Sequence, residues 1–384
     1  MIATLFLAAT LGGAQQQSLY QQIIKKPTFN NGYEEYVQAA DIAVSARLSD
    51  LNATLTATND SRTRLDRQRV IAAACGRVLN LIKQGNAKQV SYPGKLDMDV
   101  LLPELTHFRA IGAALVTKAH VDFADGRVNE GFETLMATIT FGEQISFVGP
   151  LIHDLSGRVI VLPAFKAVSE NLALASVPSA REMERTAAQL LKAGNAWATS
   201  VQFEIEVFIS ARLLSVEGIS SIGLDELIDA EFAATSDERR RAIWKELEFS
   251  LRRHYQGQLD AVKLPEREWI PAANRVMGAS KPTDPIAARI FESLLPNSSR
   301  AILHEIVRRT HLRMLRVVAA LVEFKWDHGY FPGALDQLPD PLIAQDPLTG
   351  GPFVYERQIG SFALYSEGTD DTGRIGLDYV AARN

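Results

Sequence analysis

The sequence changes character at Phe324-Lys325-Trp326-Asp327-His328-Gly329-Tyr330-Phe331-Pro332. Before this stretch, apolar residues recur at helical spacing from Leu303 to Phe324, which predicts a long amphipathic helix over residues 299–327. Gly329 can end that helix in the left-handed backbone conformation that only glycine adopts without steric cost. Pro332 then prevents the helix from resuming. A boundary between a helix and a different structure is therefore predicted here.

Two short aromatic segments follow this boundary. Phe353–Tyr355 and Ser361–Tyr365 are short, alternating and aromatic, with Gln358-Ile359-Gly360 between them. This pattern is typical of two paired strands joined by a turn. The stretch from Ser366 to Asp378 is rich in aspartate and glycine and is predicted to be an acidic loop. We therefore expect an α+β unit, a long helix with a small antiparallel sheet, over residues 299–384.

Three motifs give this unit a resemblance to a known family. They are the stretch quoted first, Gln345-Asp346-Pro347-Leu348-Thr349-Gly350-Gly351, and Phe362-Ala363-Leu364-Tyr365-Ser366-Glu367-Gly368-Thr369-Asp370-Asp371. The unit resembles the globular domain of the major pseudopilins of bacterial type II secretion systems. That family reads Tyr-(Lys/Arg)-x-Asp-x-Gly-x-Tyr-Pro, Pro-x-Asp-Pro-Trp-Gly-x-Pro-Tyr-x-Tyr and Tyr-Ser-x-Gly-x-Asp-Gly. The resemblance covers about a fifth of the 384 residues.

The long helix departs from the family. The corresponding pseudopilin helix is apolar, spans the membrane and assembles the filament. Here residues 304–316 of the helix carry seven ionisable side chains, which exclude a membrane span and the usual filament packing. They are His304, Glu305, Arg308, Arg309, His311, Arg313 and Arg316.

The resemblance also implies an ion site in the acidic stretch. The resembling pseudopilins bind calcium there through carbonyl and aspartate oxygens. In this chain Asp370, Asp371 and Asp378, with Ser366, can supply oxygen ligands of the kind that calcium prefers. The alternative is a solvated acidic turn that binds no ion. Both hypotheses remain open at this stage.

The chain before this unit, residues 15–298, is predicted to be an irregular helical bundle. Amphipathic segments are expected over 33–51 and 62–83. Residues 105–147 form the clearest unit, two helices around Ala124-Asp125-Gly126-Arg127, and they resemble a tetratricopeptide hairpin. Pro265–Pro285 holds four prolines and is predicted to be a loop or the edge of a groove.

The N-terminus predicts export. Met1–Leu11 is apolar and is followed by the small residues Gly12-Gly13-Ala14, so residues 1–14 are expected to be a signal peptide. A buried N-terminal strand is the alternative. The whole arrangement resembles exported helical proteins of planctomycete-like bacteria that end in a pseudopilin-like tail. We therefore expect a periplasmic or extracellular protein with no transmembrane helix in the mature chain.

Composition narrows the function without naming a reaction. The net charge of −5 gives no overall attraction to nucleic acid. Cys75, the single cysteine, is expected to be a small core residue, with a nucleophile as the alternative. His107, His120 and His153 lie on apolar helices and are expected to be core or boundary residues. The sequence contains no phosphate loop, nucleophile elbow or zinc-protease motif.

These observations favour an exported, non-catalytic binding or scaffold protein of the bacterial envelope. Its helical body is expected to present a groove to a protein or peptide partner. The alternative is an envelope hydrolase whose site lies between the helical body and the 265–285 loop. A third hypothesis is an accessory of secretion or pilus-like machinery.

Overall fold

The protein is mainly helical, as predicted, with a small antiparallel sheet near the C-terminus. The computed structural model describes residues 18–56, 60–94, 102–205, 235–295, 298–370 and 373–379. The predicted signal peptide, residues 1–14, lies outside the described residues. Within the described ranges, no helix has both the length and the apolar content needed to cross a bilayer.

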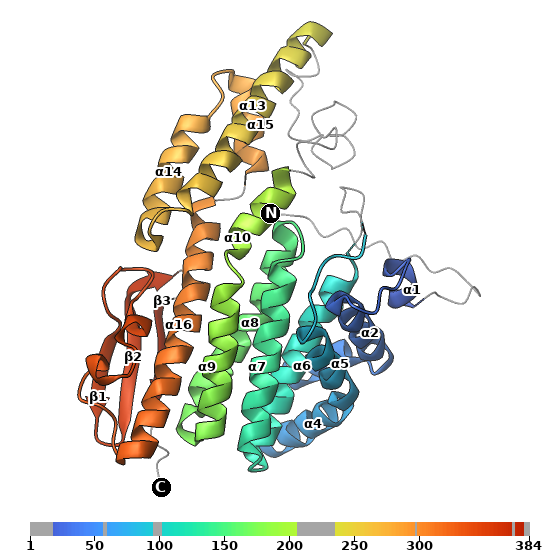
Figure 1. The fold of residues 1–384 in the computed structure, drawn as a ribbon. Coiled ribbons are helices and arrows are strands. Elements are labelled where there is room, and N and C mark those ends of the chain that lie inside the picture. Colours follow the sequence, from blue (N-terminus) through green and yellow to red (C-terminus); the bar gives the residue numbers. More distant parts are fainter. Residues whose placement is uncertain are drawn as a thin grey trace.

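The N-terminal half is a bundle of helices. They are α1 (Leu19–Ile23), α2 (Gly32–Ser45), α3 (Leu48–Thr56), α4 (Ser61–Ala74), α5 (Gly76–Asn86), α6 (Glu104–Ala124), α7 (Val128–Ser146), α8 (Leu151–Asn171) and α9 (Val177–Lys192), with the 3-10 turn η1 (Leu172–Leu174) between the last two. Figure 1 shows these helices side by side, with α9, α8 and α7 nearest to the C-terminal half.

Each of the two predicted amphipathic segments is divided between two helices. Residues 33–51 split into α2 and α3 at Arg47, whose φ of 52° lies in the left-handed region. Residues 62–83 split into α4 and α5 at Cys75. The apolar periodicity runs through both junctions, so it predicts the buried face of each segment but not its bend.

The predicted hairpin over residues 105–147 is present as α6 and α7. Gly126 has a φ of 79° and allows the tight turn between them. Gly131, at the start of α7, lies against the Phe123 ring, where an added Cβ would stand 2.6 Å from the ring. A small residue is therefore required for the two helices to meet this closely.

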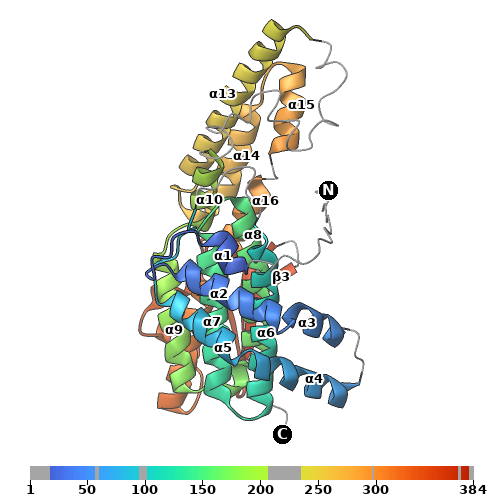
Figure 2. The same cartoon turned by 90° about the vertical axis from the view of Figure 1, so that its right-hand side faces the viewer.

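The C-terminal half begins with a group of helices at one end of the bundle. It contains α10 (Ala196–Glu204), α13 (Asp237–Ala261), η4 (Glu266–Glu268), α14 (Trp269–Ser280) and α15 (Pro285–Leu294). Figures 1 and 2 show that α13, α14 and α15 project beyond the bundle.

The loop prediction for Pro265–Pro285 was wrong for most of its length, because α14 occupies residues 269–280. Pro271 lies in the first turn of α14, where a backbone N–H has no partner within the helix. Pro285 is the first residue of α15, a position that favours proline. Pro271 and Pro285 therefore mark helix starts.

The long helix predicted over 299–327 is confirmed as α16 (Ser298–His328), and a small sheet follows it. The later elements are η5 (Leu335–Gln337), η6 (Pro341–Ala344), β1 (Val354–Gln358), β2 (Ser361–Asp370) and β3 (Gly373–Tyr379). The strands pair antiparallel in the order β1-β2-β3. The loop prediction for Ser366–Asp378 was wrong, because most of this stretch belongs to β2 and β3. Ile375, Leu377 and Tyr379 alternate with polar residues, a strand pattern that the aspartates obscured.

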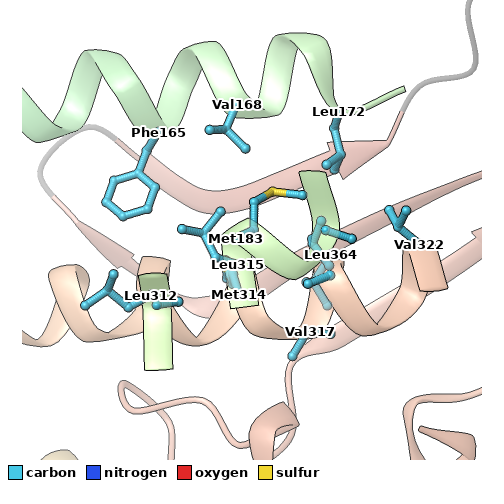
Figure 3. Close-up of a cluster of buried hydrophobic side chains, with 14 of the residues drawn as sticks. Phe165, Val168, Leu172, Met183, Leu312, Met314, Leu315, Val317, Val322 and Leu364 are labelled. Carbon is cyan, nitrogen blue, oxygen red and sulfur yellow. The ribbon is translucent and has the colours of Figure 1, made fainter. Parts of the chain in front are cut away.

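Three clusters of buried hydrophobic side chains form the core. One joins α1–α5 to α6, α7 and α8, and another joins α10, α13, α14 and α15 to the start of α16. The largest joins α6–α9 to α16 and the sheet. Figure 3 shows part of it, where Phe165 and Val168 of α8 lie near Met183 of α9, Leu315 of α16 and Leu364 of β2. The C-terminal unit therefore shares a core with the helical body.

We predict that Gly157→Ala lowers the free energy of unfolding by about 2 kcal/mol, because it overpacks the crossing of α7 and α8. A Cβ at Gly157 would stand 2.2 Å from both the Gly142 carbonyl oxygen and Ser146 Oγ. Gly278→Ala in α14 is the control, since nothing lies within 4 Å of its Cβ position. This control should gain about 0.5–1 kcal/mol from helix propensity. Urea unfolding measures both, and equal effects would refute the close crossing.

Candidate functional site

A polar cleft lies where three separate parts of the chain meet. They are the turn between α13 and α14, the middle of α16, and the Gln345–Gly350 turn before the sheet. The cavity has a volume of about 510 Å³, and we call it the arginine cleft. Its lining consists of Leu264, Pro265, Glu266, Arg267, Trp269, Arg309, Arg313, Gln345, Asp346, Pro347 and Gly350.

Two arginines of α16 are held side by side in this cleft. Arg309 and Arg313 are four residues apart, so they lie on one face of the helix. The Glu266 carboxylate accepts from Arg309 Nε and also from Arg313 Nη2, the latter at 2.8 Å. Arg313 Nη1 donates to the Gln345 carbonyl oxygen at 3.1 Å. The two guanidinium groups are therefore held by Glu266, which precedes α16 in the chain, and by Gln345, which follows it.

An aromatic ring forms another wall of the arginine cleft. Trp269 is 4% exposed, and its indole Nε1 donates to the Leu264 carbonyl oxygen at 2.7 Å. The Arg309 guanidinium carbon lies 5.9 Å from the centre of the indole ring, within the range of a cation–π contact. The ring is therefore anchored and contributes a rigid surface beside the cations.

The Asp346 side chain is committed to the turn that closes the cleft. It is buried and accepts from Leu348 N at 3.0 Å, Thr349 Oγ1 at 2.9 Å and Ser366 Oγ at 2.7 Å. Gly350 follows with a φ of 76°, and an added Cβ there would stand 2.9 Å from Arg267 Cδ. Glycine is required both for this turn and for the approach of Arg267.

The lining of the cleft carries an excess of positive charge. Arg267, Arg309 and Arg313 outnumber Glu266 and Asp346, so its formal charge is +1, although the whole chain has −5. Burial is the main influence on Arg313 and lowers the pKa of its guanidinium, which remains charged at neutral pH. A partly desolvated cation interacts more strongly with an anion than a solvated one. The cleft is therefore suited to an anionic group.

Three of the residues predicted to bind calcium lie on the strands of the sheet, Ser366 and Asp370 on β2 and Asp378 on β3. Asp370 pairs with Gly373, whereas Asp378 pairs with Ala363, so five residues of β3, about 16 Å, separate the two aspartates. The Ser366 hydroxyl donates to Asp346, and Asp371 lies outside the described residues. No group of three metal-ligating side chains occurs within the described ranges. Calcium binding at Asp370, Asp371, Asp378 and Ser366 stays a prediction.

The other predicted residues lie apart from the arginine cleft. Cys75 is buried, and burial raises the pKa of its thiol to about 12, which disfavours the thiolate that a nucleophile requires. His153 is also fully buried, and within the described structure neither ring nitrogen has a hydrogen-bond partner. Burial lowers the pKa of His153 to about 4, so the ring is neutral at pH 7. Both residues belong to the core.

The sequence pattern did not identify the residues of the arginine cleft. Arg309 and Arg313 were noted only as charges that exclude a membrane span, and Glu266 and Trp269 lay in a predicted loop. The sequence feature that could have indicated the cleft is the pair Arg309 and Arg313, which are four residues apart and therefore lie on one face of the predicted helix.

Comparisons with models of protein families, with curated proteins and with solved structures give no match to this chain. The functional argument therefore depends on the geometry described above.

We predict that His153 makes the protein sensitive to acid. Its folded pKa of about 4 lies below the ordinary value of 6.5, so the stability that it contributes is present above pH 6.5 and is lost as the pH falls toward 4. That shift corresponds to about 3 kcal/mol. Between pH 6.5 and 4, the wild type should lose about 3 kcal/mol more unfolding free energy than His153→Leu.

A second group, Glu204, also makes the unfolding free energy depend on pH, but it does not affect the comparison of the wild type with His153→Leu. Burial raises the pKa of Glu204 to about 7, so stability from that carboxyl is lost in the opposite direction, as the pH rises from 4.5 to 7. This contribution is the same in the wild type and the variant and cancels in their difference. Parallel pH profiles for the two proteins would contradict the role of His153.

Proposed function

We propose that the protein is an exported, non-catalytic binding or scaffold protein of the bacterial envelope, and that its arginine cleft receives an acidic segment of a protein partner. One observation carries the proposal, namely that Arg267, Arg309 and Arg313 converge beside Trp269 in one cavity. Guanidinium groups bind carboxylates in planar, paired hydrogen bonds. Arginine and tryptophan are also enriched among the residues that dominate protein interfaces.

The arrangement of Glu266 suits exchange of one carboxylate for another. Glu266 holds Arg309 and Arg313 in place. An incoming Asp or Glu side chain meets guanidinium groups that are already oriented, which reduces the entropy lost on binding. Arg267 is exposed and appears in no ion pair within the described structure, so it offers a further cation at the rim.

The lining of the cleft favours binding over hydrolysis. The hydrolase alternative placed its site at this junction, between the helical body and the 265–285 segment. The described lining contains no serine, threonine, cysteine or histidine, the usual nucleophiles and bases. Asp346 is fully used by its turn, and Glu266 is bound between two arginines. The cleft therefore has groups that bind an anion but no pair that activates water.

The location and architecture belong to the same proposal. Export is supported by the apolar run and small residues at the N-terminus. A pseudopilin-like origin of the C-terminal unit is supported by the order of α16, the Asp346 turn and the antiparallel strands. A tetratricopeptide-like origin of α6 and α7 is supported by Gly131 against Phe123. These features fit a scaffold that works beside secretion or pilus-like machinery.

Peptide binding tests the proposed function. A fluorescent peptide rich in Asp and Glu should bind the wild-type protein, more weakly as salt rises, because salt screens exposed charges. The same peptide with Asn and Gln should not bind. Fluorescence anisotropy should show at least about a tenfold loss of affinity in Arg313→Gln, which removes one charge-assisted contact.

Arg252→Gln is the matched control for this experiment. Arg252 lies on α13 and pairs with Glu248 on the surface, away from the arginine cleft. It should bind the acidic peptide as the wild type does. Equal losses in both arginine variants would indicate nonspecific attraction to positive charge. That result, or no binding by the wild type, would contradict the proposed function.

A further inference from the structure

A second pocket lies between α8 and α16, and its walls are apolar. It has a volume of about 280 Å³, just below the usual range for ligand pockets. Leu155, Val159, Leu162 and Phe165 of α8 face Val307 of α16 across it. Glu143 of α7 also contributes to the lining.

The apolar wall continues onto the surface of α8. Ile152, Leu155, Val159 and Leu162 are all more than 40% exposed, although each is a large hydrophobic residue. Their spacing of three, four and three residues places them on one face of the helix. An apolar chain that enters the pocket can therefore also cover part of this exposed stripe.

A buried group of charges forms the floor of the pocket. Arg308 of α16 donates through Nε and Nη2 to the two oxygens of Glu305, at 2.8 and 2.7 Å. Arg308 Nη1 donates to Glu143 Oε2. No side chain of the three is more than 4% exposed. We call Glu143, Arg308 and Glu305 the buried triad.

The buried triad has a formal charge of −1. Glu143 and Glu305 share the Arg308 guanidinium, and Arg158, which also lines the pocket, donates through Nε and Nη2 to the buried Asp154 at 2.9 and 2.6 Å. Three carboxylates and two guanidinium groups give these residues a formal charge of −1. Burial is the main reason that the pKa of Glu143 is raised, with Arg308 acting in the opposite direction. An uncompensated buried charge is costly, so the site favours a further cation.

Glu143 has an oxygen available for that cation. Within the described structure, hydrogen bonds reach only its Oε2, while the residue lines the pocket. We propose that this pocket binds a small organic cation with an apolar body, a primary alkylammonium. Its head binds Glu143 and its hydrocarbon chain packs against Leu155, Val159 and Leu162. The charge of the buried triad and the apolar walls match these two parts.

Ligands of equal chain length and different charge test the proposal. Hexylammonium, hexanol and hexanoate are titrated by calorimetry, at a pH alkaline enough to keep an ordinary imidazole neutral, because His304 and His311 also line the pocket. Hexylammonium should bind and raise the melting temperature, and the other two should not. No binding of hexylammonium overturns the proposal. Equal binding of hexanol or hexanoate overturns its charge selectivity.

Two variants separate the head from the chain. Glu143→Gln keeps the shape of the side chain and leaves Arg308 paired with Glu305, and it should weaken hexylammonium binding at least about tenfold. Val159→Ser changes an exposed position that cannot disturb the core, and it should also weaken binding. Val70→Ser, at an equally exposed valine of α4, should not. Unchanged binding in both pocket variants overturns the proposal. Acidic-peptide binding at the arginine cleft should be unaffected in all three.

Discussion

The buried guanidinium of Arg308 is the interaction on which the rest of the structure depends. A buried arginine is stable only when its lost hydration is replaced by hydrogen bonds and opposite charge. Here the replacements come from Glu143 on α7, Glu305 on α16 and the Gly194 carbonyl oxygen between α9 and α10, at 3.0 Å from Nη2. Gly194 has a φ of 103°, which allows its carbonyl to face α16. One side chain therefore fixes α16 against two parts of the helical body, α7 and the turn between α9 and α10.

The position of α16 in turn creates both sites. Its first turns pack through Ile302 and Ile306 into the cluster of α13, α14 and α15, and its later turns pack into the cluster of α8, α9 and the sheet. Arg308 points into the bundle and forms the floor of the apolar pocket. Arg309, the next residue, lines the arginine cleft and also donates to the Gly194 carbonyl oxygen, at 3.4 Å. The two pockets therefore share one helix and one fixed carbonyl.

The spacing of apolar residues in the sequence predicted the elements that each form from one continuous stretch of chain. The long helix 299–327, the hairpin 105–147 and the first two strands were all visible in it. The pattern failed for residues 265–285, where prolines suggested a loop although Pro271 and Pro285 lie at helix starts. It also failed for residues 366–378, where aspartates suggested a loop although Asp370 and Asp378 lie in strands. The sites were less predictable, because Glu266 and Arg309 are 43 residues apart, and Glu143 and Arg308 are 165 apart. Such pairings depend on tertiary packing, and the charges on α16 were therefore interpreted only as residues that exclude a membrane span.

The most direct test of this account is the unfolding free energy of Arg308→Met, measured alone and together with Glu143→Gln and Glu305→Gln. The single variant leaves two buried carboxylates without their cation, so we predict a loss of about 3–5 kcal/mol. The triple variant removes those charges as well and should recover most of that loss. A loss below about 1 kcal/mol in the single variant would show that α16 is positioned without Arg308, and would contradict the account.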